Sequence, residues 1–169
     1  EKMNVKKVLI LFFSVFLMIL VTTGCGITKT KTTAETKEMN EKEIKIDDLT
    51  KEKQTHNLGL KIVKGEYSAD GSIPDDQRLV VLTVEISNDN YLEEVGVGAG
   101  DFQLVSEGKT YQMYGGKNNF GDMIKAKGQL EGTAAYLIPA NVSKGTIIYQ
   151  PVNPKWPDME KLEWSFAVK

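Results

Sequence analysis

Apolar and polar residues follow three different patterns along the chain. Residues 8–21 form a run of 14 almost entirely apolar side chains. Residues 26–55 are dominated by Lys, Glu and Thr and contain no aromatic residue. From about residue 58 onward, apolar residues alternate with polar ones in short stretches. These patterns predict a leader, a linker and one folded domain, in that order.

The alternating stretches predict β-strands, because successive side chains of an extended chain point to opposite faces. Every second residue from 80 to 86 is apolar, and Leu79 and Val81 add an apolar second face, which predicts a central strand that is part-buried on both sides. Glu107-Gly108 predicts a hairpin turn, and residues 115–128 are predicted to be a long irregular loop. The predicted strands and the hairpin cover residues 58–67, 78–88, 93–100, 101–114, 129–139, 145–151 and 161–168.

Several short strands separated by turn residues, with almost no helical periodicity, predict an all-β sandwich. Three stretches carry a more specific resemblance. They read "VVLTVEISN" at 80–88, "DFQLVSEGKTY" at 101–111 and "KGQLEGTAAYLIP" at 127–139. Together they resemble the DUF4352-type family of small extracellular domains. The resemblance implies an immunoglobulin-like β-sandwich and an extracytoplasmic role in a Gram-positive bacterium.

The N-terminal region resembles a bacterial lipoprotein precursor. Basic residues at 2, 6 and 7 precede the apolar run, which is shorter than the roughly 20 residues of a membrane-spanning helix and matches the core of a signal peptide. Gly24-Cys25-Gly26 fits the end of a lipobox. The resemblance implies that residues 1–24 are cleaved off and that the Cys25 sulfur forms a thioether to diacylglycerol.

Lipidation of Cys25 would hold the protein on the extracytoplasmic face of the cell membrane, because two acyl chains give stable anchoring. An uncleaved anchor, or an ordinary signal peptide with an incidental cysteine, is the alternative. Palmitate is the acyl label expected on Cys25.

Residues 25–55 are predicted to be a lipid-anchored, disordered tether. From residue 26 on, the segment holds equal numbers of Lys and acidic residues. A mixed-charge segment of this kind buries too little apolar area to offset the entropy lost on ordering. The folded domain is therefore predicted to comprise residues 56–169.

The folded domain offers no recognisable catalytic constellation. His56 is the only histidine and lies at the start of the domain. A thioether at Cys25 leaves no thiolate to act as a nucleophile or ligand. The glycines of 96–100 lack the Lys-Ser/Thr pair of a phosphate-binding loop. We therefore expect no enzymatic activity, no catalytic residue and no cofactor.

The charge of the domain disfavours nucleic acid as a partner. Residues 56–169 carry 11 Lys and Arg against 15 Asp and Glu, a net charge of −4. Asp70, Asp75 and Asp76 are weak candidates for calcium ligands, and turn formation, in which Asp bonds its own backbone, is the preferred explanation. Asn88, Asp89 and Asn90 form a second loop with oxygen ligands. If the strands at 58–67 and 78–88 are antiparallel, the two loops lie at opposite ends and do not form one joint site.

Basic and aromatic residues gather in and around the predicted 115–128 loop, and a tryptophan lies between prolines nearer the C-terminus. These residues are candidates for contact with a wall polymer, an envelope protein or an anionic ligand. The alternatives are an ordinary hairpin loop and a tryptophan packed on the end of the sandwich. The candidate contact residues are Tyr114, Lys117, Phe120, Lys125, Lys127 and Trp156.

The sequence therefore predicts a cell-surface lipoprotein whose β-sandwich acts as a binding or interaction module of unknown ligand. An accessory or structural subunit of an envelope complex is the second interpretation, and a cell-wall hydrolase is the third.

Overall fold

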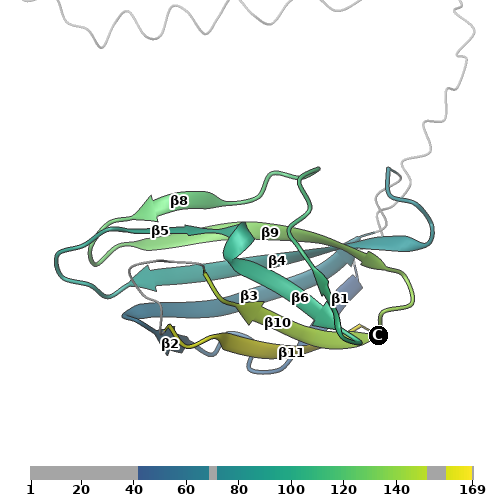
Figure 1. Ribbon diagram of the computed structural model, residues 1–169, viewed down its shortest axis with the longest axis horizontal. Coiled ribbons are helices and arrows are strands. Elements are labelled where there is room, and N and C mark those ends of the chain that lie inside the picture. The colour runs from purple at the N-terminus through teal and green to yellow at the C-terminus, as the bar shows by residue number, and fades with distance from the viewer. Residues whose placement is uncertain (1–41, 69–71, 152–158, 169) are drawn as a thin grey trace, which may run out of the picture. The chain divides into compact units, whose positions relative to one another are not determined.

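The computed structural model describes residues 42–68, 72–151 and 159–168 (Figure 1). The chain separates into two units, Glu1–Thr36 and Lys37–Lys169, and the described residues all belong to the second. Strands dominate them, and one 3-10 helix, Ala99–Asp101, interrupts the series. No helix within these ranges is long and apolar enough to span a membrane. The prediction of an all-β sandwich is confirmed.

Eleven strands are present in the described ranges. Their bounds are β1 Lys42–Ile46, β2 Lys53–Thr55, β3 Leu58–Ser68, β4 Gln77–Asn88, β5 Val95–Gly98, β6 Phe102–Ser106, β7 Lys109–Tyr111, β8 Gly121–Ile124, β9 Gln129–Pro139, β10 Lys144–Tyr149 and β11 Leu162–Val168.

The main sheet runs in the order β7-β6-β10-β11-β1-β3-β4-β9, and all of its pairs are antiparallel. It folds into two layers, one with β3, β4 and β9 and the other with β6, β10 and β11 (Figure 1). An isolated bridge between Met113 and Tyr136 joins the region after β7 to β9, so the sheet is nearly closed. The predicted hairpin is confirmed, with Glu107 and Gly108 at positive φ in the turn between β6 and β7.

Strand β1 connects the two layers. Its first two residues pair with β3, and Ile44 to Ile46 pair with β11. Ile44 and Ile46 point into the core and are only 1% and 5% exposed. The predicted tether is therefore wrong for residues 42–55. A mixed-charge segment cannot build a core of its own, but two isoleucines at alternate positions suffice to insert a strand into a core that other strands supply.

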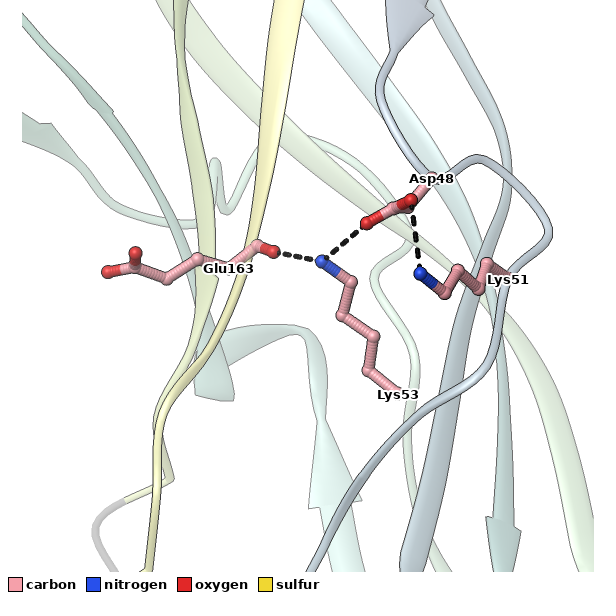
Figure 2. A network of polar contacts seen from close by, with 4 residues as sticks. All are labelled: Asp48, Lys51, Lys53 and Glu163. Atoms are coloured by element: carbon pink, nitrogen blue, oxygen red, sulfur yellow. Dashed lines mark hydrogen bonds and ion pairs between the residues drawn. The ribbon is translucent and has the colours of Figure 1, made fainter.

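Lys53 fastens the segment after β1 to β11 (Figure 2). Its ammonium donates to the carbonyl oxygen of Glu163 at 2.6 Å and forms an ion pair with Asp48 at 3.1 Å. The same group lies 5.1 Å from the centre of the Trp164 ring. The hydrogen bond from Lys53, helped by the charge of Lys51, holds the pKa of the Asp48 carboxyl below its usual range.

The core lies between the two layers, and Trp164, Tyr136, Tyr149 and Phe102 are its largest fully buried side chains. A second, smaller cluster lies on the outer face of β4 and β9, where Leu79 packs with half-buried neighbours. The prediction that the strand at 78–88 is part-buried on both faces is confirmed.

The predicted irregular loop at 115–128 contains strand β8, which pairs with β5, so that prediction is wrong in part. Phe120, just before β8, donates its N–H to the Thr133 carbonyl of β9 at 2.9 Å. Gly132 of β9 makes this approach possible, because any Cβ there would collide with the Phe120 side chain. The "GDMI" stretch of β8 carries no alternating pattern that would have predicted a strand.

The strands end at two opposite ends of the sandwich, which we call the tip and the base. The tip contains the turn between β2 and β3, the ends of β4 and β8, and the start of β9. Leu58 pairs with Asn88 there. At the base, Lys42 pairs with Tyr67 and Gln77 pairs with Pro139. The described chain therefore enters the sandwich at the base.

Candidate functional site

A buried asparagine organises the tip. Asn88, the last residue of β4, has no exposed surface. Its amide nitrogen lies 2.8 Å from the carbonyl oxygen of Glu93, 3.0 Å from that of Ile124 and 3.3 Å from that of Lys125. Its side-chain oxygen accepts the N–H of Asn90 at 3.0 Å. One side chain thus joins the connection after β4 to the turn after β8.

Backbone hydrogen bonds reinforce this junction. The N–H of Asn88 donates to the Gly128 carbonyl at 2.9 Å, and that of Lys127 donates to the Asn90 carbonyl at 3.1 Å. The N–H of Asp89 donates to the carbonyl of Asn57 in the β2–β3 turn at 2.7 Å. We call residues 56–57, 89–94 and 125–128 together the tip cluster.

Two apolar side chains stand exposed on the tip cluster. Tyr91 is 83% exposed and Leu92 is 93% exposed. The Lys127 ammonium lies 3.5 Å from the centre of the Tyr91 ring and donates to the Asp89 carbonyl at 2.6 Å. A cation this close to a ring is attracted by its quadrupole. Lys127 therefore holds the Tyr91 ring in place, while most of the surface of the Tyr91 side chain stays open to solvent.

The tip cluster also carries exposed charged side chains. Asp89, Glu93 and Glu94 are exposed carboxylates in the same loop. Lys125 and Lys127 are exposed ammonium groups in the adjacent turn. The tip cluster therefore carries three exposed negative and two exposed positive groups in addition to the apolar pair.

The structure does not bring the sequence-predicted contact residues onto one surface. Tyr114 packs on the outer-face cluster of Leu79 and Ala135, and its N–H donates to the Ala135 carbonyl at 2.7 Å. Phe120 packs against the main core, with its ring centre 6.2 Å from that of Phe102. Lys117 is exposed and lies between Tyr114 and Phe120 in the chain.

Lys125 and Lys127 alone of the predicted set lie in the tip cluster. Of the other predicted site residues, Asp75 and Asp76 are exposed before β4 at the base, and Cys25, Asp70 and Trp156 lie outside the described residues. His56, for which no role was predicted, lies in the β2–β3 turn of the tip cluster. Among described residues, no three His, Cys, Asp or Glu side chains are grouped as metal ligands would be. The Asp-rich turn and residues 88–90 lie at opposite ends, as the antiparallel pairing predicted.

Sequence reasoning missed the structural role of Asn88 and missed Tyr91 and Leu92 altogether. The available signal was the stretch "NDNYLEE" at 88–94, in which an adjacent aromatic and aliphatic residue interrupt a polar connection. Apolar residues in such a connection have no strand face to occupy, so they pack on a neighbour or stand exposed.

A second surface feature is a shallow groove of about 260 Å³ on the outer face of β3, β4 and β9. Glu52, Glu85 and Glu131 line it around Lys61. Lys61 forms an ion pair with Glu85, and the hydrogen bond to this carboxylate raises the pKa of Lys61. Glu85 of β4 and Glu131 of β9 carry the same charge and face each other directly in the register of these neighbouring strands.

Comparisons with known proteins show likeness in fold. No family model matches the chain, and no curated protein matches it in sequence. A candidate lipoprotein of Bacillus subtilis, ycdA, superposes with a TM-score of 0.53 at 20% identity over 68% of this chain. This chain spans only 38% of the length of ycdA.

Two further solved structures resemble the sandwich. The yjhA protein of Bacillus subtilis has a TM-score of 0.51 at 14% identity, covering 68% of this chain and 95% of its own. A functionally unknown protein of Listeria monocytogenes has a TM-score of 0.55 at 11% identity, covering 77% of this chain and 89% of its own. At these identities the likeness shows the fold alone.

Proposed function

We propose that the chain is a cell-surface lipoprotein whose β-sandwich is a binding module of immunoglobulin-like type, with the tip cluster as its contact surface. The observation that carries the proposal is the exposure of Tyr91 and Leu92 on a loop that Asn88 holds in place. The lipobox-like Gly24-Cys25 and the fold shared with a candidate lipoprotein support the anchor.

The position of the tip relative to the base suits this role. The described chain enters at Lys42 in the base, and Cys25 precedes it by the 16 residues 26–41. A fully extended linker of that length spans at most roughly 55 Å. A lipid on Cys25 would thus tether the sandwich by its base and leave the tip free to meet a partner in the envelope.

The energetics favour contact over passive exposure. Burying a Leu or an aromatic side chain in an interface contributes about 1.5–3 kcal/mol each, and tyrosine is enriched among residues that dominate binding energy. The hydrogen bonds of Asn88 order the loop before any partner arrives, which lowers the entropy lost on association.

Site-specific photocrosslinking of the full chain in a Gram-positive host tests the contact surface. A photoreactive phenylalanine analogue replaces Leu92 at the tip or, as a matched control, exposed Glu107 at the base. We expect discrete adducts from position 92 and few from position 107. The absence of any adduct from position 92, or equal adducts from both, would contradict the proposal.

Acylation tests the anchor. We expect Cys25→Ala to abolish palmitate labelling and to release the protein from the membrane fraction or leave an uncleaved precursor. Unchanged labelling of the Cys25→Ala chain would refute the lipid assignment.

A further inference from the structure

We propose that the partner of the tip cluster is a protein surface with an apolar pocket bordered by Lys or Arg side chains. This inference rests on the proposed function and names the chemistry of its partner.

The apolar half of the match follows from Leu92. Its side chain is 93% exposed and offers neither a donor nor an acceptor. A saccharide ring held by hydroxyl hydrogen bonds would leave Leu92 in water, and Lys127 covers one face of the Tyr91 ring at 3.5 Å, which leaves only the other face for stacking. A hydrophobic pocket buries both side chains at once, and such pockets hold the residues that dominate protein interfaces.

The charged half of the match follows from the carboxylates. Leu92 is followed directly by Glu93 and Glu94, and Asp89 lies two residues before Tyr91. Of the two opposing ammonium groups, that of Lys127 already contacts the Asp89 carbonyl and the Tyr91 ring, so Lys125 alone remains against the three carboxylates. An anionic lipid surface would repel the three carboxylates, because such surfaces attract clusters of Lys and Arg. Basic side chains around an apolar pocket complement them and steer association.

The test extends the crosslinking at position 92 in the full, membrane-anchored chain. Peptide mapping of the adduct identifies the crosslinked residue of the partner. We expect apolar residues with Lys or Arg as neighbours. We further expect Glu93→Lys with Glu94→Lys to lower the adduct yield about five-fold at low salt, because rim charges set the association rate. The matched charge reversal Glu107→Lys at the base leaves the yield unchanged.

Each remaining outcome is decisive. An adduct on phospholipid or glycan, a mapped contact surrounded by Asp and Glu, or an undiminished yield from the doubly reversed chain overturns the inference while leaving a binding tip. No adduct from position 92 refutes the proposed function and this inference with it. Protease resistance of the reversed chain on cells, compared with the unaltered chain, verifies that it is folded.

Discussion

Replacing Asn88 by alanine tests whether one buried side chain orders the tip. Asn88→Ala removes an amide whose two hydrogens are shared among three carbonyl oxygens at 2.8, 3.0 and 3.3 Å, and an oxygen that accepts the Asn90 N–H. At about 1 kcal/mol for each of two donated bonds and one accepted bond, the expected loss is ~3 kcal/mol. That is a large part of the roughly 5–15 kcal/mol that stabilises a domain.

Urea unfolding of the unit 37–169, followed by circular dichroism, measures this loss. With a slope of about 2 kcal/mol per M, the midpoint is expected to fall by ~1.5 M. Ser87→Ala is the matched control, because the neighbouring Ser87 hydroxyl is half-buried and makes one long bond of 3.5 Å to the Gly59 carbonyl. The control is expected to change the stability by less than about 0.5 kcal/mol. If Asn88→Ala costs no more than Ser87→Ala, Asn88 does not order the tip.

Asn88→Asp sharpens the same prediction through pH. An ionised carboxylate would face the three carbonyl oxygens without a hydrogen to donate, so at pH 7 we expect a larger loss than for alanine. Burial and the carbonyl oxygens raise the pKa of the introduced carboxyl above its unfolded value of about 3.9. The folded state then binds more protons than the unfolded state in that window, so the deficit relative to Asn88→Ala shrinks as pH falls through the raised pKa. A deficit that does not change with pH would contradict this account.

Three further predictions concern the N-terminal part of the sandwich. A chain that begins at residue 56 lacks Ile44 and Ile46 and the pairing of β1, and is expected to be unfolded or aggregated where 37–169 folds, as circular dichroism and gel filtration would show. Lys53→Met keeps an unbranched side chain but removes the ammonium that bonds Asp48 and Glu163 and lies near the Trp164 ring. This change is expected to lower the free energy of unfolding by about 1–2 kcal/mol in urea titrations. The Asp48 pKa is lowered from 3.8, so its ion pairs stabilise the fold above that pH and are lost as the pH falls. The free energy of unfolding of Asp48→Asn is therefore expected to be lower than that of the unaltered chain near neutrality and equal to it in acid, as urea titrations over a pH series would show.

The alternation of apolar and polar residues predicts the long strands, whereas a short strand depends on pairing partners that its own sequence does not reveal. Strands β3, β4 and β9 each carry 11 or 12 residues with apolar side chains on one face, a pattern that few other structures produce. Strand β1 has five residues and two apolar positions, and its order depends on β3 and β11, which lie far from it in the sequence. No local pattern in a charged segment reports such a partner, which is why the sequence predicts a tether over residues 42–55.

The candidate site shows the same division between local and long-range information. Tyr114 and Phe120 look like loop aromatics in the sequence, but both pack against β9. Tyr114 lies on its outer face, and Phe120 fills the space left by the missing side chain of Gly132. Tyr91 and Leu92 receive no such cover among the described residues, which only the arrangement of β4, β8 and β9 reveals. The importance of Asn88 likewise depends on carbonyl groups of residues 124 and 125, some 36 positions away in the chain.

The order of the tip and its capacity for contact can be separated by mutation. The Asn88 side chain bonds the backbone of Asn90 and Glu93, on either side of Tyr91 and Leu92 in the chain, so it orders the loop that carries the pair. If preordering supports binding, Asn88→Ala should lower the crosslinking yield from position 92 although the reactive side chain and the carboxylates around it are unchanged. The expected reduction is about three- to ten-fold, since ordering one loop on association costs about 1 kcal/mol. The Ser87→Ala chain should crosslink as the unaltered chain does. A full yield from a folded Asn88→Ala chain would show that the partner itself orders the loop, and the tip would then be an adaptable contact surface.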